Sequence, residues 1–390
     1  MDNPIEFNFD EIITRRGTAS LKWDAASDPA VLPMWIADMD FRTSPAITEA
    51  LANQVAYGIF GYPIVTAAFY QTIISWWLSK YQCAIEKQWI VPAAGTAHAI
   101  NASIRALTKS NDGIIVQTPV YNQFYSMVEN CGCRIIENEL INIDGRYEIN
   151  FEDLELKASA PNTTLLLLCN PHNPLGRVWT KEELTKIASI CAAHDVAVLS
   201  DEVYADLSHG KHLHQPFLPI GITYGLRSVT CSSPGKSFNL SGLQVAYAIS
   251  SDQTITEKIS AQLEFLMVAT PNLLAITALI AAYTDGGEWL KAVKGYIYDN
   301  YIFLKEYCER ELPIITVSDL QAGYLVWLDC RGLASRLPKI APHLLEQELW
   351  LNDGSLYGFA GEGFLRMNIA CPKLQLQKAL FKLKMVLARY

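Results

Sequence analysis

The feature that most constrains this chain is a series of short, unbroken apolar runs between about residues 90 and 250, separated by helix-like segments. A strand that is apolar on both faces is buried on both faces, which is typical of a mainly parallel sheet covered by helices. Between the runs, residues 181–195 place Leu184, Ile187 and Cys191 on one face of a helix. This alternation predicts an α/β fold. The runs are GIIVQTP (113–119), TLLLLCN (164–170), VAVLSDE (196–202), SVTCSS (228–233) and VAYAIS (245–250).

The pattern changes after about residue 270. Residues 271–312 are predicted to be helical, and beyond Pro313 the short runs ITVSDL, YLVWLDC and FLRMNIA precede a final helix at about 373–389. We therefore expect a large α/β domain at about 46–280. A smaller α+β domain would combine residues 1–45 with residues 281–390.

Composition excludes several classes of function. The formal net charge is −9, and the sequence has no run of lysine or arginine that would suit a nucleic-acid surface. The apolar runs are too short to span a bilayer, and the acidic start MDNPIEFNFDE lacks the apolar core of a secretory signal. Nine cysteines without paired spacing are typical of reduced thiols. We expect a cytoplasmic protein with no membrane or nucleic-acid partner.

Two groups of residues resemble metal ligands without forming a convincing set. Cys131 and Cys133 form a CxC, but no second ligand pair follows, so buried or strand cysteines are expected. His209, His212 and His214 lie in a polar loop with no cysteine or carboxylate at ligand spacing, and we expect them to be solvated. No metal site is predicted.

Lys236, in SSPGKSFNL, has no charged residue near it from Arg227 to Asp252. A lysine in a neutral setting can have its pKa lowered, and an amine that forms an imine needs such a shift. The alternative is an ordinary turn lysine after a strand.

Other unusual residues also follow predicted strands, where ligands bind in open α/β sheets. Gly95 and Thr96 precede a predicted helix, and the N-terminus of that helix could bind a phosphate. The alternative is an ordinary helix cap. Asn173 lies near two prolines, Pro171 and Pro174, and a rigid loop there would direct its side-chain amide at a ligand. The alternative is a plain turn. Asp201 ends an apolar strand and needs a partner, which a structural ion pair would also supply, and Tyr204 follows three positions later.

Together these groups match one ligand, an aromatic aldehyde that carries a phosphate and a basic ring nitrogen. We therefore expect pyridoxal 5′-phosphate (PLP). The lysine would form the imine, and the aspartate would keep the pyridine nitrogen protonated so that the ring can take up electrons. The asparagine and tyrosine would face the phenolic oxygen, and the glycine-led helix would hold the phosphate.

The sequence also resembles a known family over nearly its full length. The order of a GT–helix, Tyr121, NPHNPLG, DEVY, SxxK and a late arginine in GFLRMNIACP resembles the fold type I aminotransferase superfamily. FDEIITRRGTASLKWD (9–24), LPMWIADMDF (32–41) and FGYP (60–63) resemble the MalY/PatB group of cystathionine β-lyase-like C–S lyases. The resemblance implies the aspartate aminotransferase-like fold, with a large PLP-binding domain and a small α+β domain.

The resemblance also implies roles around the cofactor ring. Lys236 would attach the cofactor and move the Cα proton. Asp201 would pair with the pyridine nitrogen, while Asn173 and Tyr204 face the phenolic oxygen. Tyr121 would stack on the ring and belong to the catalytic groups; its alternative is an ordinary strand-end aromatic.

The phosphate would be held by Gly95, Thr96 and Ser233, on the same resemblance. Tyr62 would reach the phosphate of the neighbouring subunit and act in catalysis there, because active sites of this family lie at a homodimer interface. We therefore expect a homodimer with shared active sites.

For the substrate, Arg366 would bind the α-carboxylate as a bidentate fork, a geometry that lysine does not reproduce. Its alternative is a structural arginine on a sheet. Asn173 would also contact the substrate, and the backbone near Ile36 and Ala37 would close over it.

Some residues depart from the lyase pattern. Tyr204 and the string GTAH look more like transaminases, whereas Gln244 stands where transaminases usually have arginine. We expect a C–S β-lyase that converts cystathionine, cysteine or related S-substituted cysteines to a thiol, pyruvate and ammonia. The alternatives are a class I/II aminotransferase and a regulatory protein that binds a transcription factor. The preferred thioether depends on pocket shape and is not predicted.

Overall fold

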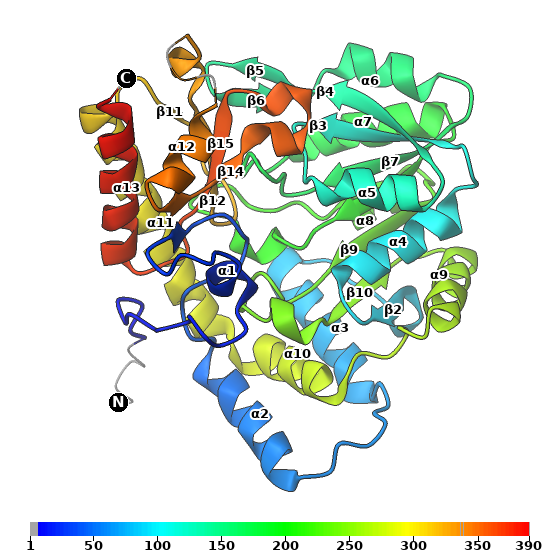
Figure 1. Ribbon diagram of the computed structural model, residues 1–390. Coiled ribbons are helices and arrows are strands. Elements are labelled where there is room, and N and C mark those ends of the chain that lie inside the picture. Colours follow the sequence, from blue (N-terminus) through cyan, green and yellow to red (C-terminus); the bar gives the residue numbers. More distant parts are fainter. Residues whose placement is uncertain (1–6, 336, 338, 390) are drawn as a thin grey trace.

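The computed structural model describes residues 7–335, 337 and 339–389, and a seven-stranded sheet lies at its centre (Figure 1). The strand order is β2-β10-β9-β8-β7-β3-β4. β10 runs antiparallel to both neighbours, whereas the pairs from β9 to β4 are parallel. The predicted α/β fold with a mainly parallel sheet is therefore confirmed. The strands are β2 (Ile90–Ala93), β3 (Gly113–Thr118), β4 (Arg134–Glu139), β7 (Thr163–Cys169), β8 (Ala197–Asp201), β9 (Ser228–Ser232) and β10 (Ala246–Ile249).

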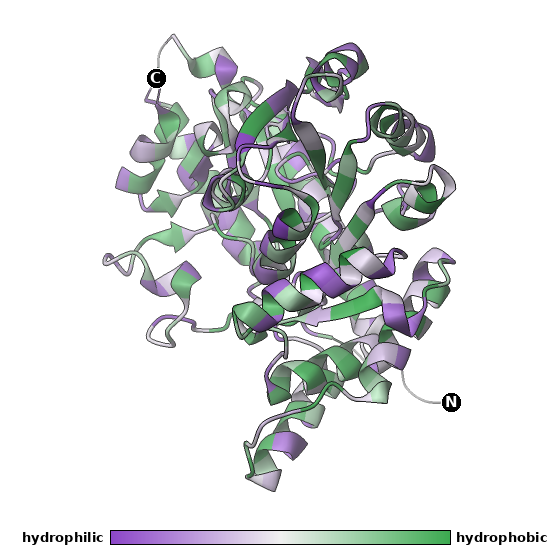
Figure 2. Cartoon of the chain, turned by 90° about the vertical axis from the view of Figure 1, so that its right-hand side faces the viewer, coloured by the Kyte–Doolittle hydropathy of each residue, from purple (hydrophilic) through white to green (hydrophobic). Residues whose placement is uncertain are grey.

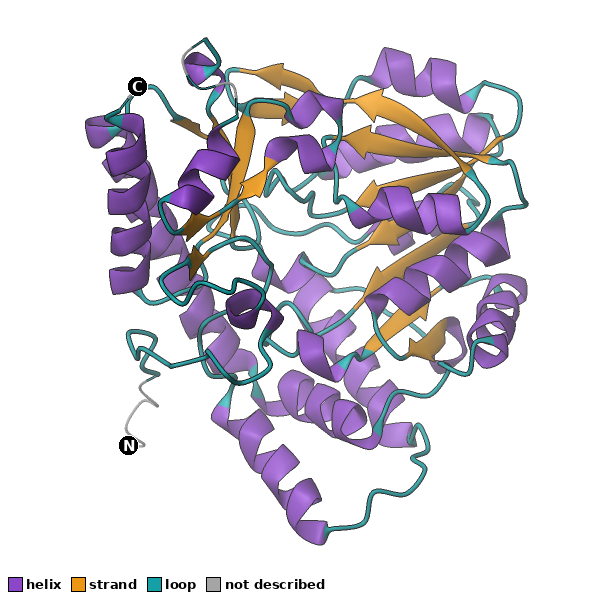
Figure 3. Cartoon of the chain, viewed as in Figure 1, coloured by secondary structure: helices purple, strands orange, loops and turns teal. Residues whose placement is uncertain are grey.

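Helices cover both faces of this sheet (Figure 3). One face packs against α4 (Thr96–Leu107), α5 (Gln123–Asn130) and α9 (Gln253–Phe265). The other packs against α6 (Phe151–Ala158), α7 (Lys181–Ala193) and α8 (Phe217–Thr223). The predicted apolar face of α7 is fully buried, and a capping box between Thr180 and Glu183 begins the helix.

The C-terminal part forms a second layer with its own sheet, in the strand order β11-β12-β15-β14. The region predicted as helix at 271–312 is two helices, which meet at Gly286, where a Cβ would lie 2.5 Å from the Phe238 ring. The division into domains at 46–280 and 281–390 stays a prediction. The elements are α10 (Leu273–Asp285), α11 (Gly287–Glu311), β11 (Thr316–Val317), β12 (Leu325–Asp329), α12 (Ile340–Glu346), β14 (Asn352–Asp353), β15 (Phe364–Asn368) and α13 (Lys373–Leu387).

The fold also contains two smaller features. The hairpin of β5 (Ile141–Ile143) and β6 (Arg146–Glu148) follows β4. The N-terminal segment contains α1 (Leu21–Asp24) and β1 (Leu32–Pro33), and β1 pairs in parallel with β13 (Leu349–Trp350). Residues 1–6, with the start of the predicted N-terminal segment, lie outside the described residues.

α2 (Pro45–Tyr57) and the loop of residues 58–66 project at the bottom of Figure 1, and α3 (Ala67–Tyr81) then returns the chain to the core. We call residues 55–64 the arm. It exposes large apolar side chains, and green colours this projecting region in Figure 2. These side chains are Val55, Tyr57, Ile59, Phe60, Tyr62 and Ile64.

A buried cluster of charges anchors the N-terminal segment. Asp40 is 4% exposed and accepts bonds from Lys22 (2.8 Å), Arg15 (2.7 Å), the Trp23 indole (2.8 Å) and Gln375 (2.8 Å). Burial alone would raise the pKa of Asp40, but these cations and the indole hold it below its usual value. The cluster fixes residues 35–40 against the C-terminal layer.

The expectation that the loop histidines are solvated is wrong for two of the three. His209 is buried and hydrogen-bonds to the Gly323 carbonyl at 2.6 Å, and burial lowers its pKa to about 4. His214 is buried against Glu202, with 2.8 Å between Nε2 and Oε2. The sequence missed this because the carboxylate partner comes from the end of β8, not from the loop.

All nine cysteines are unpaired; Cys133 is buried and Cys131 partly buried, in the turn between α5 and β4. Within the described ranges, no three His, Cys, Asp or Glu side chains gather as metal ligands would. Nor does any described helix combine the length and apolar character needed to cross a membrane.

Candidate active site

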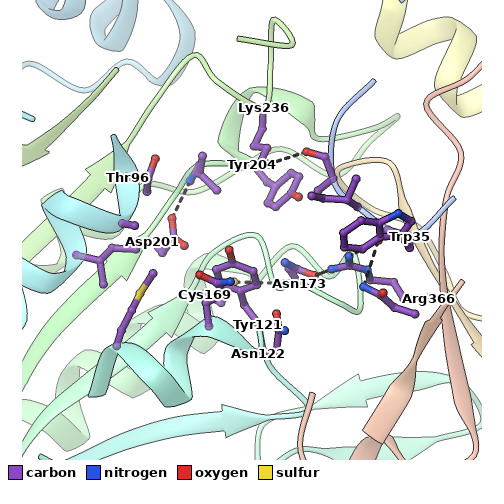
Figure 4. A pocket seen from close by; sticks show the side chains of 18 residues that line it. Trp35, Thr96, Tyr121, Asn122, Cys169, Asn173, Asp201, Tyr204, Lys236 and Arg366 are labelled. Atoms are coloured by element: carbon purple, nitrogen blue, oxygen red, sulfur yellow. Dashed lines mark hydrogen bonds between the residues drawn. The ribbon is translucent and has the colours of Figure 1, made fainter. Parts of the chain in front are cut away.

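The carboxyl ends of β7, β8 and β9 open onto a cavity of about 260 Å³, shown in Figure 4. A second cavity of about 270 Å³ adjoins it at Thr96, Tyr121 and Lys236. Of the predicted site residues, nine line the first cavity and five line the second, with three shared. The first set is Ile36, Ala37, Thr96, Tyr121, Asn173, Asp201, Tyr204, Lys236 and Arg366. The second is Gly95, Thr96, Tyr121, Ser233 and Lys236, of which Thr96, Tyr121 and Lys236 are the shared ones.

Lys236 lies in the turn after β9 and points into the cavities rather than into solvent. Its Nζ donates to the Ala37 carbonyl at 2.6 Å and to Ser241 Oγ at 3.3 Å. Burial lowers the pKa of Lys236 to about 8, and Arg366 acts in the same direction. A neutral amine is therefore accessible near neutral pH, as imine chemistry requires.

Asp201 is the last residue of β8 and is 4% exposed. Its carboxylate accepts one bond, from the Val203 amide at 3.3 Å, and forms no ion pair with any described cation. Burial raises its pKa to about 7. The structural ion pair considered for Asp201 is absent here; the neighbouring Glu202 has such a partner, His214.

Arg366 lies in the middle of β15, so the C-terminal layer contributes its side chain to the cavity. Its Nη1 donates to Asn173 Oδ1 at 3.2 Å and its Nη2 to the Trp35 carbonyl at 2.7 Å. Its Nε is buried and has no hydrogen-bond partner among the described residues. A buried donor without an acceptor fits a ligand carboxylate.

Two tyrosines, Tyr121 and Tyr204, line the first cavity. Tyr121 packs edge-on to Phe124, and burial raises its pKa to about 12. Tyr204 is buried edge-on to Tyr324. Burial also raises the pKa of Tyr204, so both phenols stay protonated and can donate hydrogen bonds.

The second cavity lies at the N-terminus of α4. Gly95 precedes α4 with φ +111°, a conformation that disfavours other residues, and Thr96 begins the helix. The first N–H groups of α4 and its dipole favour an anion there. Ser233 Oγ donates to the Val245 carbonyl at 2.6 Å and accepts from the Gly235 amide at 2.9 Å, so it also holds the loop.

The segment over the cavity is held by residues that sequence reasoning missed. Asn368 donates to the carbonyls of Ile36 and Asp38, both at 2.7 Å. Trp35 stacks on Trp350 with ring centroids 4.6 Å apart and also lines the cavity. Only its place in the string MWIAD hinted at Trp35, and nothing in the sequence linked Asn368 to a segment 330 positions away.

Tyr62 is the one predicted site residue that the described chain does not bring to either cavity. It lies on the arm and is fully exposed.

Comparison with known proteins agrees with this geometry. A model of the family "Aminotransferase class I and II" matches residues 31–383. The chain belongs to the aminotransferase class I and II family. It is 39% identical to the cystathionine β-lyase PatB of Bacillus subtilis, over 98% of this chain and all of that protein. It is 32% identical to the protein MalY of Escherichia coli, over 95% of this chain and 96% of that protein.

Among solved structures, cystalysin from Treponema denticola, which contains a PLP cofactor, superimposes with a TM-score of 0.95. The two are 30% identical, and the match covers 99% of this chain and 100% of that one. The predicted resemblance to the fold type I superfamily and to the MalY/PatB group is confirmed.

Proposed function

We propose that this protein is a PLP-dependent C–S β-lyase that acts on L-cystathionine, L-cysteine or related S-substituted cysteines. One observation carries the proposal: the buried, unpaired carboxylate of Asp201 shares a cavity with a lysine of lowered pKa and with an arginine that has a free donor. The similarity of this chain to PatB and to cystalysin supports the lyase reaction.

The residues present fit PLP. Asp201 would pair with the ring nitrogen, because that charge satisfies a buried carboxylate that otherwise has one weak hydrogen bond. Asn173 and Tyr204 would face the phenolic oxygen, and Tyr121 would stack on the ring. Gly95, Thr96 and Ser233 would hold the phosphate. When bound, the cofactor withdraws electrons from the Cα of the attached amino acid.

The chain's own residues account for the remaining steps. Arg366 would hold the substrate α-carboxylate through its free Nε and so fix which Cα bond faces Lys236. Lys236, with a pKa of about 8, would remove the Cα proton as a neutral amine. The segment of Ile36 and Ala37, held by Asn368, would keep water from the Cα.

We also propose a homodimer with shared sites. The arm exposes six large apolar side chains in one projecting stretch, and such surface is costly to leave in water. Tyr62, which is fully exposed on the arm, would reach the phosphate site of the partner. Mixing Tyr62→Ala with Lys236→Ala subunits should then restore activity that each mutant homodimer lacks. No recovery after proven subunit exchange would contradict a shared site.

The unpaired state of all nine cysteines supports a reducing compartment, and we place the protein in the cytoplasm on that ground.

The main alternative is an aminotransferase, which Tyr204 at the phenolic-oxygen position favours. The test is the fate of L-cystathionine given to the PLP-loaded enzyme without a keto acid. A lyase releases homocysteine, pyruvate and ammonia over many turnovers. If the enzyme stops after one turnover and 2-oxoglutarate restarts it, the protein is an aminotransferase.

A further inference from the structure

Under the proposed function, the cofactor or the common part of the substrate would engage every charged side chain among the described residues that line the first cavity. These side chains are Asp201, Lys236 and Arg366. The ring nitrogen, the aldehyde and the α-carboxylate would take one each. Among the described lining residues, none remains to neutralise a charge on the substrate's side chain.

The rest of the polar lining is uncharged. Asn122 and Gln123, at the start of α5, make no side-chain hydrogen bond in the described part of the chain. Asn352 uses its Nδ2 for the Trp35 carbonyl (3.1 Å) and the Tyr357 hydroxyl (2.8 Å), which leaves its Oδ1 as an acceptor. We call Trp35, Asn122, Gln123 and Asn352 the side-chain subsite.

We propose that the side-chain subsite selects sulfur substituents with no net charge and disfavours anionic ones. The inference rests on the proposed lyase function and names its substrate class: S-substituted cysteines whose leaving thiol is neutral or zwitterionic. Free amides satisfy hydrogen bonds of such a group, but they cannot neutralise a carboxylate that leaves water.

Two competing effects bear on this selection. The N-terminus of α5 attracts anions, but a helix dipole is worth less than the penalty of an unpaired, partly desolvated carboxylate. The partner's arm would bring no charge either, because residues 55–64, VAYGIFGYPI, contain no ionisable groups except Tyr57 and Tyr62.

The test uses two substrates of nearly the same shape, S-carbamoylmethyl-L-cysteine and S-carboxymethyl-L-cysteine. Their affinities are measured as dissociation constants from the absorbance change of the bound cofactor immediately after mixing, before cleavage becomes appreciable. We expect the neutral compound to bind at least about tenfold more tightly.

Gln123→Lys places a cation in the subsite, and Gln123→Met is the matched neutral control. Lysine should reduce the affinity ratio of the two compounds about tenfold, whereas methionine should leave it unchanged. Each variant is judged by the ratio of its affinities for the two compounds, because an effect that changes both affinities equally leaves this ratio unchanged.

Equal affinities in the wild type, or equal effects of lysine and methionine, would overturn the proposed selection. Failure of the lyase function has a different signature. In that case L-cystathionine yields no pyruvate over repeated turnovers, while the two affinities still report on the subsite.

Discussion

Replacing Asp201 by asparagine should stabilise the cofactor-free protein and disable the loaded enzyme. In the cofactor-free chain the carboxylate is buried at the end of β8 with one hydrogen bond at 3.3 Å and no ion pair among the described residues. Its charge is therefore a cost to folding. Asparagine has nearly the same shape and carries no charge.

The size of this effect follows from the pKa of Asp201, which burial raises from 3.8 to about 7. Each pKa unit corresponds to about 1.4 kcal/mol, so the ionised form costs the folded state about 4 kcal/mol. A carboxyl group with a raised pKa destabilises the fold as pH rises from its unfolded value to its folded value. Between pH 5 and pH 8, wild-type stability should therefore fall by about 3 kcal/mol relative to Asp201→Asn.

The assay is urea unfolding of both cofactor-free proteins at pH 5 and pH 8. Glu202→Gln is the control, because Glu202 is equally buried but is bonded to Ser200, Phe217 and His214. That variant should lose about 1–3 kcal/mol, since it disturbs satisfied bonds. With PLP bound, Asp201→Asn should lose activity on the order of 10²–10³-fold. If its stability relative to wild type does not rise with pH, the carboxylate is not an unpaired buried charge.

Three further predictions concern single residues. Arg366→Lys should lower kcat/KM for cystathionine by about 2–4 kcal/mol in transition-state terms, through lost carboxylate alignment, as steady-state kinetics will show. Lys236→Ala should bind PLP but lose the covalent bond to it that borohydride reduces. In the wild type, borohydride should fix the cofactor on Lys236, and a labelled peptide that contains another lysine would contradict this assignment. Asp40→Asn should cost about 3–5 kcal/mol in urea unfolding, because buried Lys22 loses its partner, whereas Asp38→Asn, at a partly exposed site, should cost less.

The sequence predicted the parts of the fold that local pattern determines. Each of the five apolar runs contains a strand of the central sheet, because burial on both faces leaves a continuous signal. The edge strand β4 was not predicted. Its sequence RIIENE is largely exposed on one side, so charged residues interrupt the apolar run.

The site was predictable where its residues follow strands. Asp201 ends β8, while Asn173 and Lys236 lie in the loops that follow β7 and β9, and parallel strands bring such positions to one edge. The residues that support them were not predictable. Asn368 reaches Ile36 across two segments joined only in the folded chain, and the partner of His214 is a carboxylate on another element.

Among the described residues, two lysine–aspartate sets differ in character, one buried and one lining the cavity. Lys22 and Asp40 lie 2.8 Å apart, with Arg15 and Trp23 completing the bonds, so that cluster is satisfied without any ligand. Lys236 and Asp201 share a cavity but form no ion pair. Burial raises the pKa of Asp201 and lowers the pKa of Lys236, so it favours the neutral form of each group. Under the proposed function, a ligand with a basic ring nitrogen and an aldehyde would relieve that cost. Both sets contain the same residue types. What distinguishes the candidate site from the structural cluster is that Lys236 and Asp201 form no ion pair.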